Sequence, residues 1–162
     1  MEDDNEKLLE KPRGRRCFAC GTENPIGLKL NFYRMGDTVR SNVELGIYHE
    51  GWQNMAHGGI ISTLLDETMS WAVMYFKKAL FVTRKMELKY IKPVFTGVSL
   101  IVSAKIDSET KWPIIRAKGE IRDSVGGLLV RSVGEFVALS PEQLASFPED
   151  EKQEMLSLVA RF

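Results

Sequence analysis

Hydrophobic and polar residues alternate along six stretches of the chain, and one long apolar run separates the second stretch from the third. Alternation with a period of two is typical of strands with one buried face. The predicted strands are Leu28–Arg34, Thr38–Leu45, Phe81–Tyr90, Val98–Asp107, Trp112–Asp123 and Leu128–Leu139. The breaks between successive strands on each side of the long run are short, so these strands are expected to pair as antiparallel neighbours.

The long apolar run predicts a helix from about Gly58 to Phe76 that is apolar on most of its circumference. One face of a sheet covers only one side of such a helix, so the helix must be enclosed. A strongly curved antiparallel sheet of about six strands around a long central helix meets this requirement and predicts an α+β protein with the hotdog fold.

The two ends of the chain differ from its middle. Residues 1–16 are polar and predict a loosely held N-terminal arm, in which Leu8 and Leu9 could start a short helix. Residues 17–140 form the expected single hotdog domain, and residues 141–162 a C-terminal helical tail packed on it.

The tail carries two helix-start signals. Ser140 is a suitable N-cap with Pro141 at the first helical position. Ser146 and Glu149 have the spacing of a capping box, which predicts a second start.

Composition narrows the class of protein. With 162 residues, 44% hydrophobic and 27% charged, the chain has the profile of one soluble globular domain. Lys+Arg and Asp+Glu both number 22, so no basic excess suggests a nucleic-acid partner. No apolar signal-peptide segment opens the sequence, and Asp66 and Glu67 interrupt the longest apolar run, so we expect a cytoplasmic protein without a membrane span.

Cys17 and Cys20 form a single CxxC motif. A structural zinc site needs four ligands and both histidines lie far along the chain, so no metal site is expected within one chain. Three interpretations stay open for the pair: free structural thiols, half of an intersubunit metal or disulfide arrangement, and a redox site.

Asp66 occupies a particular stripe of the predicted helix. At about 100° per residue, it lies at the centre of a stripe of small residues and Glu67 lies at the border of that stripe. The small residues are Gly59, Ser62, Thr63 and Ser70. Such a stripe suits a close partner or a substrate channel, where partial burial would make Asp66 a better base. The alternative for Asp66 is a carboxylate on a solvated or subunit-facing surface. Glu67 is compatible with a solvated neighbour, a member of an ion pair or a catalytic residue.

His57, Gly58 and Gly59 open the helix, where free backbone N–H groups and the helix dipole favour negative charge. The two glycines leave room for a ligand, as an oxyanion hole requires. A flexible helix entry that needs glycine for its turn is the simpler alternative.

The segment HGGIISTLLD, residues 57–66, resembles the HGG…D/E signature of hotdog-fold acyl-CoA thioesterases of the phenylacetate-pathway (PaaI-like) group, within the 4-hydroxybenzoyl-CoA thioesterase superfamily. The segments CFACGTENPIGLKL, TRKMELKY and YIKP resemble the same group. The resemblance implies an acyl-CoA thioesterase without a cofactor, built as a dimer or a dimer of dimers with active sites between subunits.

The resemblance also implies roles for single residues. Asp66 would attack the thioester or activate water, and the Gly58 N–H would polarise the carbonyl. His57 would orient the site or approach the thioester, and Thr83 would position water. Several members carry an Asn six residues before the His, where this chain has Gly51, and Asn54 could substitute if the loop bends.

Substrate-binding candidates complete this set. Arg84 and Lys85 could meet coenzyme A phosphates, together with Lys89 and Lys92, although a solvated sheet face explains them too. Trp52 and Trp71, with Met55, Met69 and Met74, could line an acyl pocket or belong to the core. The further candidates at the helix are Gly59 and Ser62. A non-catalytic acyl-CoA binder and a hotdog hydratase or dehydratase are the alternative functions.

Overall fold

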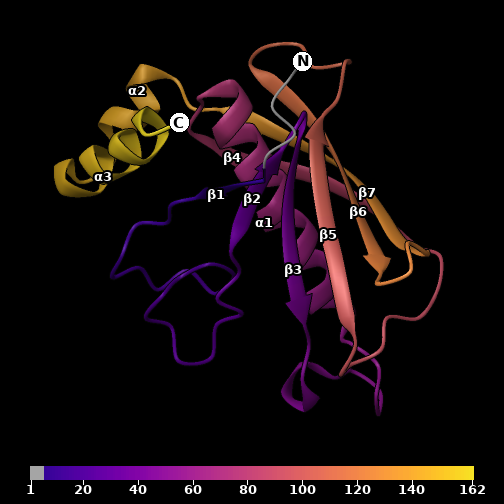
Figure 1. The fold of residues 1–162 in the computed structure, drawn as a ribbon. Coiled ribbons are helices and arrows are strands. Elements are labelled where there is room, and N and C mark those ends of the chain that lie inside the picture. The colour runs from indigo at the N-terminus through magenta and orange to yellow at the C-terminus, as the bar shows by residue number, and fades with distance from the viewer. Residues whose placement is uncertain (1–5) are drawn as a thin grey trace.

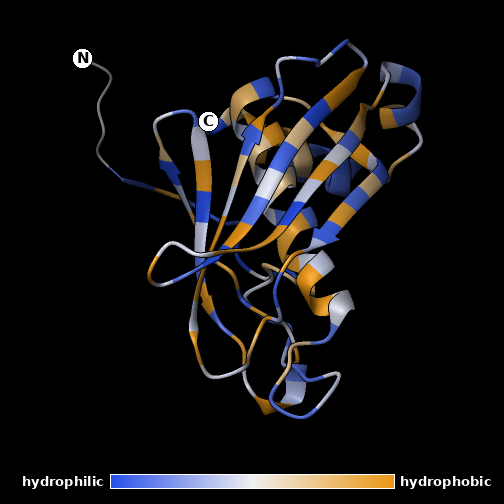
Figure 2. Cartoon of the chain, turned by 90° about the vertical axis from the view of Figure 1, so that its right-hand side faces the viewer, coloured by the Kyte–Doolittle hydropathy of each residue, from blue (hydrophilic) through white to orange (hydrophobic). Residues whose placement is uncertain are grey.

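The computed structural model describes residues 6–162 as one antiparallel sheet folded against one long helix, α1 (Gly58–Lys77). Its strands are β1 (Lys7–Leu9), β2 (Phe32–Met35), β3 (Thr38–Glu44), β4 (Phe81–Tyr90), β5 (Ser99–Ile106), β6 (Ile114–Asp123) and β7 (Leu128–Ala138), in the spatial order β1-β2-β3-β5-β6-β7-β4 (Figure 1). A short 3-10 turn, Ile47–His49, precedes α1. Figure 2 shows apolar and polar residues alternating along the strands.

The predicted hotdog arrangement is confirmed. The central helix and the four strands after it lie within two residues of the predicted bounds. The sheet has seven strands in residues 6–162, rather than about six, because Leu9 pairs with Phe32 at the sheet edge. The arm therefore contributes a strand where the sequence suggested the start of a short helix, and Leu9 is buried. The first five residues of the predicted arm lie outside the described residues.

The first predicted strand begins later than its alternation indicates. Leu28 and Leu30 donate their backbone N–H groups to Phe18 and Ala19 of the N-terminal loop, and Lys29 has a positive φ of 52°. The prediction that residues 28–31 form a strand is therefore wrong, because their backbone pairs with the loop.

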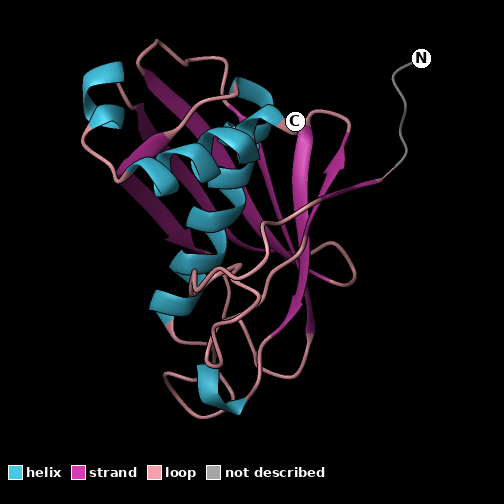
Figure 3. Ribbon diagram, turned by 90° about the vertical axis from the view of Figure 1, so that its left-hand side faces the viewer, coloured by secondary structure: helices cyan, strands magenta, loops and turns pink. Residues whose placement is uncertain are grey.

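A row of small residues lies beneath α1. Ala104, Gly119 and Ser132 are paired neighbours on β5, β6 and β7. A Cβ placed on Gly119 would lie 3.1 Å from Leu65 and 3.3 Å from Met69, both fully buried on α1. The helix therefore sits close to the sheet, as Figure 3 shows. Other segments of the chain pack against its remaining faces.

The C-terminal tail forms α2 (Pro141–Ala145) and α3 (Glu149–Ala160) beside the end of α1. Ser140 caps α2 as predicted, whereas the predicted capping box at Ser146 is wrong, since Ser146 ends α2 and Pro148 caps α3. Phe162 packs edge-on against Trp71, with ring centroids 5.8 Å apart. No helix within residues 6–162 has the length and apolarity to cross a membrane.

The close contact between α1 and the sheet predicts a specific sensitivity to side-chain volume. Gly119→Val should lower the free energy of unfolding by about 1–3 kcal/mol through overpacking against Leu65 and Met69. Gly46→Val is the matched control, because nothing lies within 4 Å of its Cβ position. Urea unfolding measures both, and equal stabilities of the two variants would contradict the tight packing.

Candidate active site

Asp66 lies in a shallow groove between α1 and the edge strand β4. The Thr83 hydroxyl donates a hydrogen bond to Oδ1 of Asp66 at 3.0 Å. The groove has a volume of about 300 Å³ and is lined by Ser62, Thr63, Asp66, Thr83, Arg84, Lys85 and Met86. The structure thus brings together six residues that the sequence had singled out: the catalytic candidates Asp66 and Thr83, the substrate-binding candidates, and Thr63 of the stripe of small residues.

The environment of Asp66 suits a base or a nucleophile. Burial raises the pKa of Asp66, the Thr83 hydrogen bond partly offsets this rise, and the nearby Cys17 raises the pKa further. A half-buried carboxylate that faces an open groove can take a proton from a bound water or attack an electrophile itself.

The stripe of small residues is open along only part of its length. Ser62 and Thr63 donate hydrogen bonds to the carbonyl oxygens of Gly58 and Gly59, one helical turn earlier. Ser70, which the helical projection placed on the same stripe, is buried with 9% exposure. The accessible part therefore runs from the helix start to Asp66.

The start of α1 leaves the Gly58 N–H available to a ligand. Nδ1 of His57, the N-cap, accepts a hydrogen bond from the Gly59 N–H at 2.9 Å. The Gly59 N–H is therefore occupied, while the Gly58 N–H has no acceptor within residues 6–162. Since Nδ1 accepts, the proton of a neutral His57 ring sits on Nε2.

Tyr90, at the end of β4, is a residue of this region that the sequence analysis did not assign to the site. Its hydroxyl donates to the Gly58 carbonyl at 3.1 Å and lies 3.3 Å from the Ser62 hydroxyl. The sequence pattern could not identify this contact. Alternation places Tyr90 on the apolar face of its strand, and no local pattern links it to Gly58, 32 residues earlier.

Arg84 is the extra residue of a β-bulge between Thr83 and Lys85. The bulge explains why Arg84 interrupts the alternation of β4 and why both basic side chains line the groove. Lys85 also forms an exposed ion pair with Glu87 at 3.4 Å.

The loop before α1 does not bring every candidate to the groove. Gly51 lies against His57, since a Cβ there would be 3.2 Å from the Cα of His57. Asn54 occupies a left-handed turn with φ of 62°, and its backbone N–H donates to Glu50. Trp52 is 80% exposed and does not line the groove.

Glu67 points away from Asp66 toward the N-terminal loop. Its Oε1 accepts a hydrogen bond from the Trp71 indole at 3.1 Å and lies 3.7 Å from the Cys17 sulfur. Burial raises the pKa of Glu67 to about 7. Trp71 itself is core, stacked on Phe32.

The two cysteines beside Glu67 differ from each other. A hydrogen bond from Cys20 lowers the pKa of Cys17 to about 5 against the effect of burial, and backbone N–H groups add to this lowering. The pKa of Cys20 is raised by the same Cys17 contact and by burial. No pattern in the sequence indicated that Glu67 lies beside these two cysteines.

Residues 53–111 match the sequence profile of the thioesterase superfamily. The matched segment contains all of α1, including Asp66, and all of β4. No curated protein sequence matches the chain significantly.

Solved structures of thioesterases share the fold. A thioesterase superfamily protein with 27% identity and a TM-score of 0.71 covers 76% of this chain, which spans 60% of that protein. PaaI from the phenylacetic acid degradation operon of E. coli has 16% identity and a TM-score of 0.61, covering 68% of this chain and 83% of its own. A hypothetical thioesterase from Streptococcus pneumoniae, solved with coenzyme A, has 17% identity and a TM-score of 0.61 over 68% and 86%. Fold and profile confirm the resemblance to hotdog-fold thioesterases.

The Thr83–Asp66 hydrogen bond predicts a pH effect. Because the bond lowers the pKa of Asp66, Thr83→Val should raise that pKa, so activity that needs the carboxylate is lost at a higher pH than in wild type. The loss of one hydrogen bond to a charged group should reduce kcat/KM about tenfold on the acid side. The pH profile of kcat/KM measures the shift.

Thr38→Val is the matched control for this pH profile. Its hydroxyl bonds the Met35 carbonyl in the β2–β3 turn. If Thr83→Val leaves the acid limb where wild type has it, Asp66 is not the titrating group.

Proposed function

We propose that this protein is a cytoplasmic acyl-CoA thioesterase of the PaaI-like group, which hydrolyses a thioester to a free acid and coenzyme A. The observation that carries the proposal is the pairing of a half-buried Asp66, held by Thr83, with a free Gly58 N–H on the same helix. The match of residues 53–111 to the thioesterase superfamily supports it.

In the proposed reaction, the thioester carbonyl oxygen accepts a hydrogen bond from the Gly58 N–H, at the positive end of the α1 dipole. Asp66 assists attack on the carbonyl carbon, either by taking a proton from the attacking water or by adding to the carbon itself. The C–S bond then breaks, and the coenzyme A sulfur leaves and takes up a proton. Where Asp66 itself adds to the carbon, water afterwards hydrolyses the resulting anhydride and releases the acid. His57 would orient the site, with its Nε2–H free to meet the substrate.

The proposed substrate fits the charge of the groove. Arg84 and Lys85 of β4 line the same groove as Asp66 and would meet phosphates of coenzyme A. A Streptococcus mutans protein of similar fold was solved bound to acetyl CoA, with 14% identity and a TM-score of 0.58. Gly59, Ser62, Asn54 and Trp52 remain proposed substrate contacts.

We propose a homodimer, or a dimer of dimers, as the active form. The outer edge of β4 has no partner strand within residues 6–162, and this strand is ten residues long. A second copy paired along β4 would cover the unpaired edge and close the groove beside Asp66. The active site would then contain residues of both subunits.

The proposal predicts thiol release from one or more acyl-CoAs, measured with a thiol reagent over an aliphatic and aromatic panel. Asp66→Asn should lower kcat by about 10²–10⁴-fold, because the variant loses its base or nucleophile and keeps its shape. Asp37→Asn, in the β2–β3 turn, is the control and should match wild type. Unchanged hydrolysis by Asp66→Asn would refute the mechanism, and binding without any thiol release by wild type would instead indicate an acyl-CoA binder.

The oxyanion role of the Gly58 N–H can be tested with one substitution. Proline suits the first position of a helix, and His57 already has the extended backbone (φ −64°, ψ 135°) that precedes proline. Gly58→Pro replaces the N–H by a ring carbon and should lower kcat about 10²–10³-fold in a folded protein.

Gly58→Ala is its matched control. The alanine adds a Cβ at 3.4 Å from the Tyr90 hydroxyl but retains the N–H, so it should keep most of the activity. Equal activities of the two variants, both shown to be folded by circular dichroism, would assign the oxyanion contact to another group.

A further inference from the structure

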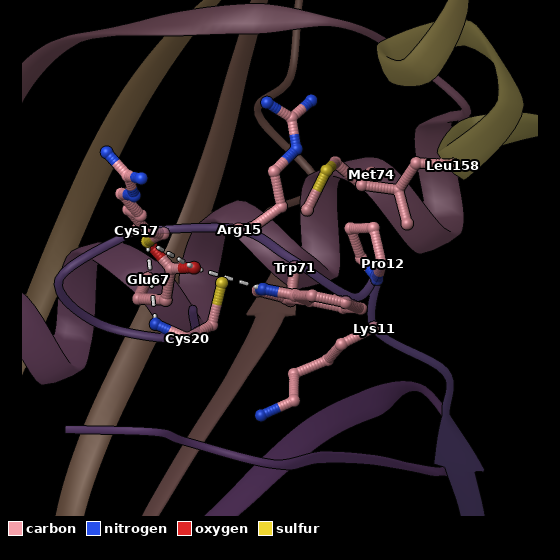
Figure 4. Close-up of a pocket in the computed structure, with 10 residues that line it drawn as sticks. Lys11, Pro12, Arg15, Cys17, Cys20, Glu67, Trp71, Met74 and Leu158 are labelled. Atoms are coloured by element: carbon pink, nitrogen blue, oxygen red, sulfur yellow. Dashed lines mark hydrogen bonds between the residues drawn. The ribbon is translucent and has the colours of Figure 1, made fainter. Parts of the chain in front are cut away.

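Three metal-ligating side chains converge beside α1, outside the groove of Asp66. Cys17 and Cys20 come from the N-terminal loop and Glu67 from the helix, and their ligand atoms all lie within 4.8 Å of one another. Figure 4 shows both sulfur atoms and the carboxylate directed toward one another. Thioester hydrolysis as proposed above does not use this cluster.

We propose that Cys17, Cys20 and Glu67 bind one Zn²⁺ ion per chain, with the fourth coordination position open to the adjacent pocket. Thiolates and a carboxylate are ordinary zinc ligands, at about 2.3 Å and 2.0–2.2 Å from the metal. A tetrahedral site with those bonds separates a sulfur from an oxygen by about 3.5 Å. The Cys17 sulfur and the Glu67 oxygen are already 3.7 Å apart.

The loop is shaped to present both sulfurs on one side. The Cys20 N–H donates to the Cys17 sulfur at 3.4 Å, and the Gly21 N–H donates to the Cys17 carbonyl at 2.9 Å. A Cβ at Gly21 would lie 2.5 Å from the backbone nitrogen of Cys17, so the turn needs glycine there. This turn holds both thiols within 4.8 Å of the Glu67 carboxylate.

The Glu67 carboxylate is oriented by a hydrogen bond from Trp71. The Trp71 indole N–H donates to Glu67 at 3.1 Å, and the same ring stacks on Phe32 with centroids 4.7 Å apart. Metal ligands are commonly oriented by such an outer hydrogen bond from a rigid neighbour. Trp71 thus serves as a positioning residue for the proposed site.

The surroundings suit the charge of the occupied site. Two thiolates and one carboxylate around Zn²⁺ leave one net negative charge, and Lys11, Arg15 and Arg16 line the same pocket of about 440 Å³. The pocket gives the fourth position access to water, as in zinc sites with three protein ligands.

The proposed ion would fix the N-terminal loop onto α1. A Cys17–Cys20 disulfide would use neither Glu67 nor its indole donor, so the three-residue cluster favours a metal over a redox pair. This conclusion differs from the sequence-based expectation of no metal, which considered ligands from the two cysteines and the distant histidines only.

Titration with Co²⁺ under reducing conditions tests the site without reference to enzyme activity. Wild type should bind one equivalent per chain and develop thiolate-to-cobalt charge-transfer absorption with the strong visible bands of tetrahedral coordination, and Zn²⁺ should displace the Co²⁺. Glu67→Gln and Cys17→Ser should each weaken Zn²⁺ binding at least about 100-fold, and Trp71→Phe, which keeps an aromatic ring, about tenfold.

His49→Gln is the control and should bind Zn²⁺ as wild type does. Two free thiols per chain, counted before the titration, ensure that oxidation does not mimic a failure to bind. The absence of thiolate-to-cobalt absorption at one equivalent, unchanged affinity in Glu67→Gln, or one ion per two chains would each overturn the proposal.

Discussion

The close packing of α1 on the sheet determines where every other part of this protein can lie. Leu65 and Met69 reach the sheet at Gly119, where an added Cβ would lie 3.1 Å and 3.3 Å from them, closer than ordinary van der Waals contact. With one side of the helix fixed at this distance, its outer sides meet β4, the N-terminal loop and the C-terminal tail. Each of these three segments contacts a different set of helix residues.

Adjacent carboxylates on α1 therefore have different surroundings. Asp66 faces β4, where Thr83 is its hydrogen-bond donor and a groove gives access from outside. Glu67, one residue later, faces the N-terminal loop and the Trp71 indole. Burial raises the pKa of both, yet only Asp66 lines the groove between α1 and β4. The two proposals, hydrolysis at Asp66 and metal binding at Glu67, rest on this division.

Regular periodicity made the central helix, the last four strands and the position of Asp66 predictable from sequence. Periodicity failed where tertiary contacts decide the backbone: Leu9 forms an edge strand, and Leu28 pairs with the N-terminal loop. Tyr90 and the Cys17–Glu67 contact join residues 32 and 50 positions apart, and no local pattern encodes such contacts. The resemblance implied roles for His57 and Thr83, and the structure shows the hydrogen bonds that hold their side chains.

The most direct test of the central claim is a crystal structure of the Asp66→Asn variant with an intact acyl-CoA thioester bound. The account predicts the thioester carbonyl oxygen at about 3 Å from the Gly58 nitrogen, with residue 66 facing the carbonyl carbon. It also predicts phosphates near Arg84 and Lys85 of one of the subunits. A thioester bound away from the start of α1, with the Gly58 N–H unoccupied, would contradict the account.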